Sequence, residues 1–361
     1  MKKTLSLKKY LHAALLLLCI CSLLIFPSVS AQAKTTVKMK TTSVTLSVGQ
    51  SKTLKLSGTS KNPKWSSNKK AVATVDRKGK VTAVGKGTAT ITAKLGSKKY
   101  TCKVLVCSSS SGNERVDKEI HRIIRKIIKP NMSTVEKVKA VHDYLVLNNT
   151  YDHSSSGTYM HDISEVERLL FDHTSVCVGY AYSFQLFMDA LNIPCNYVDG
   201  KAQDVSDTEF SGHVWNMVKI NGAWYHVDVT WDDSYESLES NLVTYRYFLV
   251  PDNYISKNHQ WDRSSYPVCN ANRSSYKSLA TKIGHVAKTP KQAAQYISQD
   301  FKKGNMYSMI LIPKNSYNNN YVSNTLGYAV YSYGVKYKVS QTVSCTYYMW
   351  NNYHVLHFPK P

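Results

Sequence analysis

Three short segments of the chain hold residues whose types and spacing suit nucleophilic chemistry. Cys177 stands just before a stripe of apolar residues with helical period, so we expect it in the first turn of a helix with Ser175 or Thr174 as the N-cap. A helix N-terminus presents unpaired backbone NH groups and a partial positive charge, and both favour a thiolate over a thiol. Cys177 is therefore the candidate nucleophile.

A partner for the thiol proton is predicted on a hairpin further along the chain. Two strand-like segments flank Asn221–Gly222, a strong signal for a two-residue turn. This turn sets His213 opposite Thr230, with Asp228 as its diagonal neighbour on the same face. The imidazole of His213 is then placed to take the thiol proton, while the Asp228 carboxylate orients the ring and stabilises its charged form.

Other polar residues compete for these roles. His226 lies two residues before Asp228 on the same strand face and is the alternative base, but it lacks the preceding glycine that His213 has. Asp232 and Asp233 are too few ligands for a calcium loop, so we expect them in a solvated turn. The chain has no CxxC pair, HExxH helix, phosphate loop or dinucleotide glycine pattern, and we expect neither a cofactor nor a metal.

The three segments resemble motifs of the transglutaminase-like superfamily of cysteine enzymes, which share a papain-like Cys-His-Asp arrangement. The motifs are VCVGYA at Val176–Ala181, GHVWNMV at Gly212–Val218 and WYHVDVTWDD at Trp224–Asp233. They occur in family order, and the resemblance covers about Val116–Asp262. It implies an α+β papain/transglutaminase-like core in which Cys177 is the nucleophile, His213 the base and Asp228 the orienting acid.

The resemblance implies acyl transfer on a protein or peptide substrate through a thioester. The backbone NH of Cys177 is the expected donor to the oxyanion. The sequence does not identify a second donor, because Trp215 and Tyr180 are equally well explained by packing. Water as the second nucleophile gives a peptidase or deamidase, whereas a lysine amine gives a crosslink, and the motifs do not separate these outcomes.

Helical segments lead up to the nucleophile. Isoleucines with helical period occupy residues 120–128 and Pro130 ends that helix, while Ser133–Glu136 and Ser164–Glu167 read as capping boxes. We place the catalytic domain at residues 115–265, with a strand within 245–252 near its end.

The first 33 residues read as a secretory signal peptide. Lys2, Lys3, Lys8 and Lys9 form a charged region, the apolar run Ala13–Phe26 follows, and Ala31–Ala33 offers the small-x-small pattern of a cleavage site. The run is shorter than the roughly 20 residues that a spanning helix needs. We therefore expect a secreted, extracellular protein whose mature chain has no transmembrane segment.

Residues 34–107 are predicted to form a small β-sandwich. Short segments rich in Val and Thr alternate with turn signals, and Trp65 is the expected core residue. Val44–Leu54, Trp65–Val75 and Gly79–Ala93 resemble a bacterial Ig-like domain of group 2, a type of module that usually serves attachment or spacing. Residues 108–114, rich in serine, form the predicted linker.

The charge of the chain is concentrated in this module. The formal net charge is +22, and residues 34–107 hold 17 basic residues against one acid, Asp76. An exported module of this charge fits anionic cell-wall polymers, and it could equally serve only to keep a spacer soluble. Nucleic acid is not an expected partner, because the protein is exported and has no aromatic platform among its lysines.

The last part of the chain, residues 266–361, is assigned as a small α/β region of unknown role. We expect a helix at 289–301 and strands at 306–313, 327–333 and 354–358. Twelve of the 26 tyrosines fall after residue 270, and strand packing explains them better than a ligand-binding belt.

The cysteines bear on the same reading. Six remain after the signal peptide, and a free Cys177 leaves five, which cannot all pair, so we expect at least one further free thiol and assign no disulfide.

Three functions agree with these patterns. The first is a secreted cysteine acyl-transfer enzyme held near anionic cell-envelope polymers by its basic module. The second is a catalytically inactive relative of the same fold that binds a surface. The third, a nucleic-acid or heparin binder, rests on charge alone. The complete Cys-His-Asp set favours the first.

Overall fold

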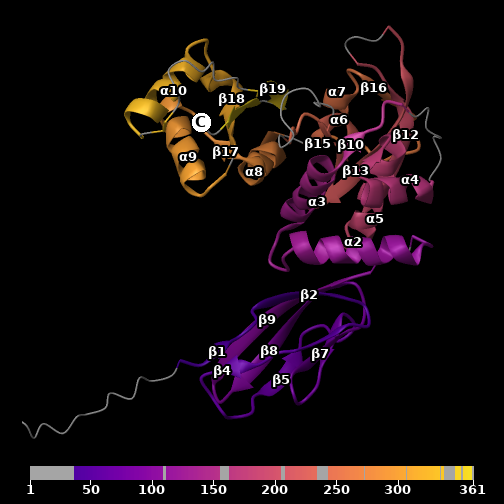
Figure 1. Ribbon diagram of the computed structural model, residues 1–361, viewed down its shortest axis with the longest axis vertical. Helices are drawn as coiled ribbons and strands as arrows, with labels where there is room; N and C mark the ends of the chain where they lie inside the picture. Colours follow the sequence, from indigo (N-terminus) through magenta and orange to yellow (C-terminus); the bar gives the residue numbers. More distant parts are fainter. Residues whose placement is uncertain are drawn as a thin grey trace, which may run out of the picture. The chain divides into compact units, whose positions relative to one another are not determined.

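A computed structural model gives the fold of most of the chain (Figure 1). It describes residues 36–108, 111–154, 162–204, 208–233, 243–271, 273–305, 307–333, 335–336, 346–350 and 353–359. The expected signal peptide and Cys345 lie outside the described residues. None of the helices within these ranges combines the length and the apolar content needed to cross a bilayer.

The N-terminal module is the predicted β-sandwich, drawn in indigo and violet in Figure 1. One sheet has the order β2-β9-β8-β5 and the other β3-β7-β6, while β1 and β4 pair as a short ribbon. Ala89, Ile91 and Ala93 are buried at every second position of β8, as the alternation predicts. The strands are β1 (Lys38–Met39), β2 (Ser43–Ser47), β3 (Ser51–Thr53), β4 (Leu56–Ser57), β5 (Lys64–Ser67), β6 (Ala73–Val75), β7 (Lys80–Ala83), β8 (Gly87–Leu95) and β9 (Lys98–Cys107).

Trp65 is not the core residue that the sequence suggested, because it is only half-buried. Its ring packs over the backbone of Gly79, where a Cβ would lie 2.8 Å from the indole and 2.7 Å from the carbonyl oxygen of Leu54. Strand β2 ends at Ser47, and the next residue, Val48, is 43% exposed. Small and branched residues of the facing strands fill the sandwich instead.

The second part of the chain is the predicted α+β core. Its sheet has the order β15-β14-β13-β12-β16, and α5 packs on β12 and β13. Nearly every residue of α5 is buried, including Tyr180, Phe184 and Phe187, which explains why its apolar stripe is broad. The elements that follow the helical lead-in are α5 (Cys177–Ala190), β12 (Cys195–Ala202), β13 (Ser211–Ile220), β14 (Ala223–Val227), α6 (Val229–Asp233), β15 (Phe248–Val250), α7 (Asp252–Ile255) and β16 (His259–Trp261).

The helical lead-in agrees with the sequence at one predicted capping box and differs at the other. Ser133 and Glu136 form the predicted box at the start of one helix. The box at Ser164–Glu167 is wrong, since Asp162 caps that helix by accepting from the backbone NH of Ser164. Aspartate is as good an N-cap as serine, and Asp162 starts the helix two residues earlier. The elements are α2 (Glu114–Ile127), α3 (Thr134–Asn148), β10 (Thr150–Tyr151), α4 (Ile163–Glu167), the π-helical turn η1 (Arg168–Asp172) and β11 (Thr174–Ser175).

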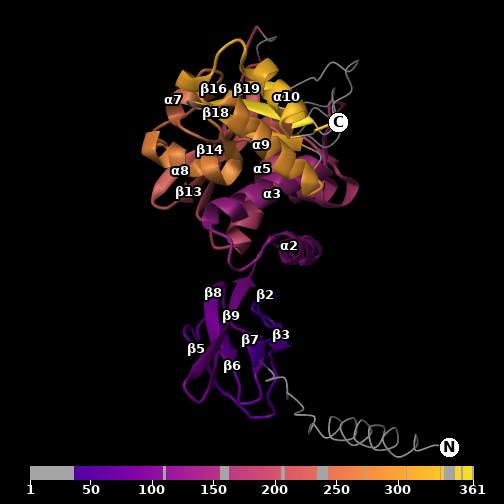
Figure 2. The same cartoon turned by 90° about the vertical axis from the view of Figure 1, so that its left-hand side faces the viewer.

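The C-terminal region is α/β, as expected (Figure 2). Its sheet has the order β17-β18-β20-β19, α9 packs on β18, and Thr289 caps α9 as predicted. The strand predicted at 327–333 is wrong: residues 327–331 belong to α10, which buries Tyr321, Thr325 and Ala329 at helical spacing. The elements are α8 (Arg273–Ile283), β17 (His285–Val286), α9 (Pro290–Lys302), β18 (Tyr307–Pro313), the 3-10 turn η2 (Lys314–Ser316), α10 (Tyr321–Tyr331), β19 (Thr346–Trp350) and β20 (Tyr353–Pro359).

Candidate active site

Cys177 is the first residue of α5, as the sequence predicted. The cap differs from the prediction: Val176 is the N-cap and provides no side-chain hydrogen bond. Ser175 is not available as a cap, because its hydroxyl donates to the carboxylate and the carbonyl oxygen of Glu165. The first backbone NH groups of α5 are therefore left to a ligand, and the partial positive charge of the helix end acts on the sulfur.

A glycine fixes the segment that precedes the nucleophile. A Cβ at Gly179 would lie 2.1 Å from Ser175 Oγ and 2.7 Å from the carbonyl oxygen of Glu165. The first turn of α5 can thus press against β11 and α4 only because this position has no side chain. Since β11 runs directly into Val176, this contact sets where the sulfur of Cys177 lies.

We expect Gly179→Ala to displace the nucleophile. Relief of the clash should lower the free energy of unfolding by about 1–3 kcal/mol and reduce the alkylation rate of Cys177. Gly327→Ala in α10 is the matched control, since nothing lies within 4 Å of its added Cβ, and it should stabilise the protein by up to about 1 kcal/mol. Urea unfolding and timed alkylation measure both quantities. A Gly179→Ala protein as stable and as reactive as the parent would contradict this role.

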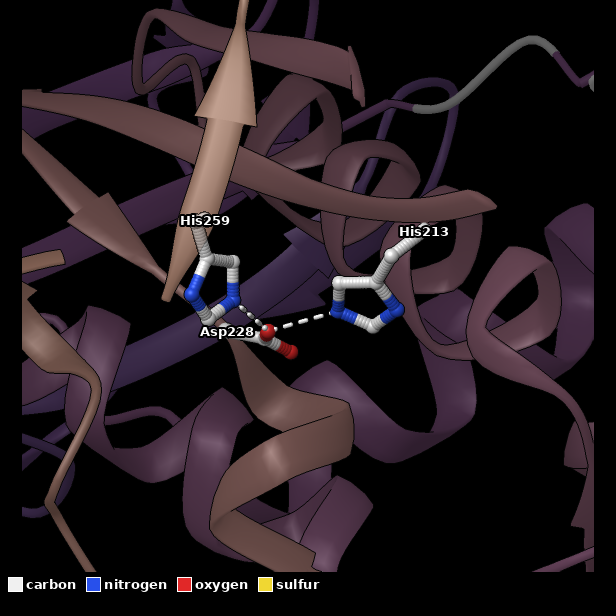
Figure 3. A group of neighbouring side chains, drawn as sticks. All are labelled: His213, Asp228 and His259. Atoms are coloured by element: carbon white, nitrogen blue, oxygen red, sulfur yellow. Dashed lines mark hydrogen bonds and ion pairs between the residues drawn. The ribbon is translucent and has the colours of Figure 1, made fainter. Parts of the chain in front are cut away.

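The structure brings His213 and Asp228 together, as Figure 3 shows. The distance from His213 Nε2 to Asp228 Oδ2 is 2.7 Å, and both side chains are buried. Burial by itself lowers the pKa of His213, but the charge and hydrogen bond of Asp228 and contact with Cys177 outweigh it and raise that pKa to about 10. Burial favours a protonated Asp228, yet the two neighbouring histidines hold its pKa well below the usual range. The pair is therefore an imidazolium and a carboxylate at neutral pH.

The hairpin that carries this pair has the predicted register, with one difference. Ile220 pairs with Ala223, so the turn at Asn221–Gly222 forms as expected. However, β14 ends at Val227, one residue before Asp228, so Thr230 lies in α6 and does not pair with His213 as predicted. The chain turns there into α6, and the backbone NH of Trp231 donates to Asp228 Oδ1 at 3.1 Å. The acid is thus held by a helical turn instead of a strand.

Contact with Cys177 completes the set of three. A hydrogen bond and a charge interaction with the Cys177 sulfur both contribute to the raised pKa of His213. His213 therefore lies between Cys177 on one side and Asp228 on the other, which is the arrangement that general-base activation of a thiol requires.

His226, the competing base, has a different role. The indole NH of Trp215 donates to His226 Nδ1 at 2.9 Å, and the other nitrogen, Nε2, lies 2.8 Å from Asp252 Oδ1. An indole can only donate, so Nδ1 must be the acceptor and Nε2 must carry the proton. Burial lowers the pKa of His226, in keeping with a neutral ring.

The two side chains considered as second oxyanion donors are both engaged elsewhere. Trp215 uses its only NH for His226, and Tyr180 donates its hydroxyl to Asp233. The structure thus supports the packing interpretation of both residues.

Asp232 does not lie in a solvated turn, which corrects the prediction. It is 1% exposed and accepts hydrogen bonds from His142 Nε2 at 3.1 Å and the backbone NH of Tyr247 at 2.9 Å. Burial raises the pKa of Asp232 in spite of these donors. Asp232 thus ties α6 to α3 and to the segment just before β15.

A second histidine on Asp228 was missed by the sequence analysis. His259 Nε2 lies 3.0 Å from Asp228 Oδ2, and the His259 side chain is buried. His259 opens β16, the edge strand that pairs with β12. The short aromatic segment His259–Trp261 was the available signal, but no local spacing links it to Asp228.

Aromatic rings enclose the imidazoles. The ring of Trp215 stacks on His213 with centroids 5.9 Å apart, and Trp231 approaches His259 edge-on at 4.6 Å. Such rings remove water from the pair and strengthen its electrostatic coupling.

Two groups of side chains in the described residues have the composition of metal sites. One is His213, Asp228 and His259, and the other is His226, Asp252 and Cys269. In the first, the two nitrogen-to-oxygen distances of 2.7 and 3.0 Å are those of hydrogen bonds, whereas ligands of a tetrahedral zinc stand about 3.4 Å apart. In the second, Nδ1 accepts from Trp215, so a metal on Nε2 would leave the ring without its proton.

The five described cysteines are free thiols. Burial raises the pKa of Cys102 to about 11 and also raises the pKa of Cys107, Cys195 and Cys269. These four are protonated at neutral pH, and of the described cysteines only Cys177 stands at a helix N-terminus beside a histidine.

Comparisons with known proteins find two domain families in the chain. Residues 121–229 match the family model of the transglutaminase-like superfamily, and residues 33–104 match that of the bacterial Ig-like domain of group 2. Kyphoscoliosis peptidase of Mus musculus is 22% identical over 145 residues, 38% of this chain and 22% of that protein, so the chain spans about a fifth of the length of this relative.

Two solved structures are similar over part of the chain. A putative cysteine protease from Cytophaga hutchinsonii is 20% identical, with 42% of this chain and 45% of that chain covered and a TM-score of 0.27. A structure described as a TGase is 18% identical, with 50% and 47% covered and a TM-score of 0.28. The family match includes Cys177, His213 and Asp228 and ends before His259. By these two family models, the chain contains a transglutaminase-like domain preceded by a bacterial Ig-like domain of group 2.

Proposed function

We propose that the protein is a secreted cysteine acyltransferase or peptidase that acts on carboxamide or peptide carbonyls. One observation carries the proposal: His213 contacts the thiol of Cys177 on one side and a buried carboxylate on the other. A catalytically inactive surface-binding protein has no need to keep an imidazolium buried against a free thiol, because burying charge costs free energy.

The first half of the reaction forms a thioester. The Cys177 sulfur attacks the carbonyl carbon, a carbon–sulfur bond forms, and the oxyanion accepts a hydrogen bond from the backbone NH of Cys177. His213 then gives its proton to the departing nitrogen, the carbon–nitrogen bond breaks, and ammonia or an amine leaves.

The second half returns the enzyme to its starting state. Neutral His213 takes a proton from water or from an amine as that nucleophile attacks the thioester. The carbon–sulfur bond breaks, the product is a carboxylic acid or a new amide, and the thiolate–imidazolium pair is restored. Asp228 stabilises the imidazolium in both halves.

Mass spectrometry of peptide products tests this proposal. The purified protein is incubated with a glutamine-containing peptide library, with and without an added alkylamine. Deamidation adds about 1 Da, cleavage splits the peptide, and transamidation adds the amine minus ammonia. Cys177→Ala is the control. Products that form equally with the Cys177→Ala protein, or no products at all, would contradict an enzyme.

The Ig-like module is proposed to hold the enzyme at anionic cell-wall polymers such as teichoic acids. Lys64 stands directly opposite Lys94, which stands directly opposite Lys99, so three exposed lysines form a row across β5, β8 and β9. Like charges in facing positions of a sheet destabilise it. A bound polyanion would neutralise these lysines and remove their mutual repulsion.

We expect neutralising this row to remove binding. A protein with Lys64, Lys94 and Lys99 all changed to Gln should lose salt-sensitive retention on purified cell walls, since screening acts on such exposed charges. The same change should raise the free energy of unfolding by a few tenths of a kcal/mol. Exposed Lys257, Lys288 and Lys291 changed to Gln form the control with equal net charge. Equal retention of both proteins in a pull-down would contradict the proposed surface.

A further inference from the structure

One oxygen of the buried carboxylate serves two imidazoles. Asp228 Oδ2 lies 2.7 Å from His213 Nε2 and 3.0 Å from His259 Nε2, and Figure 3 shows the two rings approaching it from opposite sides. Asp228 and His259 are each no more than 1% exposed. Asp228 Oδ1 accepts from the backbone NH of Trp231, so both oxygens of this anion have donors.

The orientation of the Asn258 amide leaves His259 with too few protons for the acceptors around it. Nδ1 of His259 lies 3.0 Å from Asn258 Oδ1, and the amide nitrogen of Asn258 lies 2.6 Å from Tyr247 Oη. The ring then faces an acceptor on each nitrogen, whereas a neutral imidazole has one NH. Burial lowers the pKa of His259, which opposes a second proton.

Turning the Asn258 amide resolves the conflict. Amide oxygen and nitrogen are distinguished by their hydrogen-bond partners. With the amide turned, Tyr247 Oη–H donates to Asn258 Oδ1, Asn258 Nδ2–H donates to His259 Nδ1, and His259 Nε2–H donates to Asp228 Oδ2. Each of these three hydrogen bonds has one donor and one acceptor, and the series ends on the Asp228 carboxylate.

We propose that His259 is a positioning residue for the acyl transfer proposed above, held as the neutral Nε2–H tautomer by Asn258 so that it fixes Asp228 against His213. His259 does not touch the reacting atoms. It spreads the charge of Asp228 over a second hydrogen bond and keeps Oδ2 aimed at His213. The titratable groups that face His259 are Asp228, His213, His226 and Tyr247.

The tautomer can be observed directly, whether or not a substrate is known. Long-range nitrogen–proton NMR spectra of the full chain, labelled with ¹⁵N at histidine, distinguish the two tautomers from imidazolium. A His259→Gln protein assigns the signal. We expect His259 as the Nε2–H tautomer from pH 6 to 8. The Nδ1–H tautomer or an imidazolium would overturn the proposal while leaving the proposed enzyme intact.

Asn258→Asp provides a second, isosteric test. A carboxylate can accept from Tyr247 but cannot donate to His259 Nδ1, so His259 should become an imidazolium. The positive charge on His259 then repels the positive charge on His213. The pKa of His213, followed in the same spectra, should therefore fall by about one unit or more. Where turnover is measured, the alkaline limb of kcat/KM should move down equally.

A neighbouring substitution separates this effect from added charge alone. Gln260→Glu adds the same charge at the next residue of β16, whose side chain is exposed, and should leave the pKa of His213 unchanged. Equal shifts in the two proteins, or none in Asn258→Asp, would overturn the proposal.

The kinetic effect of losing the donor should be confined to kcat. His259→Leu should lower kcat about ten- to a hundredfold, as expected for one buried hydrogen bond to a charged group, with KM changed less than twofold. His259→Gln, which keeps an NH donor, should recover part of the loss. An equal loss of kcat in His259→Leu and His259→Gln would contradict a role that depends on hydrogen-bond donation to Asp228. If His259→Leu does not fold, the NMR tests above still decide the proposal.

Discussion

Replacing His213 with alanine should lower the rate of Cys177 alkylation at pH 7 by at least about tenfold and should lower kcat/KM by about 10⁴-fold. His213 is charged at neutral pH because Asp228 and Cys177 raise its pKa to about 10 against the effect of burial. A cation beside the sulfur stabilises the thiolate, and the same group supplies the proton to the leaving nitrogen. Alanine removes both contributions and leaves only the end of α5.

Peptide mapping after a short pulse of iodoacetamide measures this change. The four other described thiols are internal controls, since burial raises the pKa of each and keeps them protonated. His121→Ala on α2 is the matched histidine control and should react like the parent. Equal labelling of Cys177 with and without His213 would mean that the pair is not activated, and the inactive surface-binding function would then be preferred.

The contact between His213 and Asp228 could be predicted from the sequence because both residues belong to one hairpin, whereas the set of three with Cys177 came from the family resemblance. A helix start is marked by the apolar stripe that follows Cys177, and a two-residue turn at Asn221–Gly222 fixes a hairpin register. Counting along that register brings His213 to Asp228 even though β14 stops one residue short of the acid. The helical turn that follows the short strand β14 still leaves the Asp228 side chain within hydrogen-bond distance of His213.

His259 could not be predicted, because its place depends on pairing between distant strands. β16 joins the sheet at the far edge of β12, and Ala202 pairs with His259 across 57 positions of the chain. No turn or periodic pattern spans such a distance. Local patterns also failed where a helix and a strand have similar sequences. The segment at residues 327–333 was expected to be a strand, but residues 327–331 form the end of helix α10.

Buried polar residues were the other source of error. Asp232 follows Trp231 in a segment that resembles a turn, but it is buried and accepts three hydrogen bonds from residues distant in the sequence. Asn258 and Tyr247 were likewise assigned no role. Short-range sequence signals show which residues prefer water, and they do not show which partners the fold brings to them.

Replacing Asp228 with asparagine should lower kcat by about 10³-fold while the fold is retained. Oδ1 of asparagine can still accept from the backbone NH of Trp231, so the amide nitrogen must take the place of Oδ2. That NH₂ group donates to His213, which must then accept at Nε2 and carry its proton on Nδ1. The ring is then neutral with its only proton on the side of Cys177, so it neither takes the thiol proton nor stabilises a thiolate, and it has also lost the carboxylate charge that raised its pKa.

The pH dependence gives this prediction a second measurement. Because the pKa of His213 is raised, its contribution to the free energy of unfolding is complete below its unfolded pKa of about 6.5 and is lost as pH rises toward 10. Because the pKa of Asp228 is lowered, its contribution is present above its unfolded pKa of about 4 and is lost at lower pH. The parent should therefore exceed Asp228→Asn in free energy of unfolding most between about pH 4 and 6.5. The alkaline limb of kcat/KM should lie at least one unit lower in Asp228→Asn. Asp262→Asn, at an exposed carboxylate, is the control, and a shared profile would remove Asp228 from the mechanism.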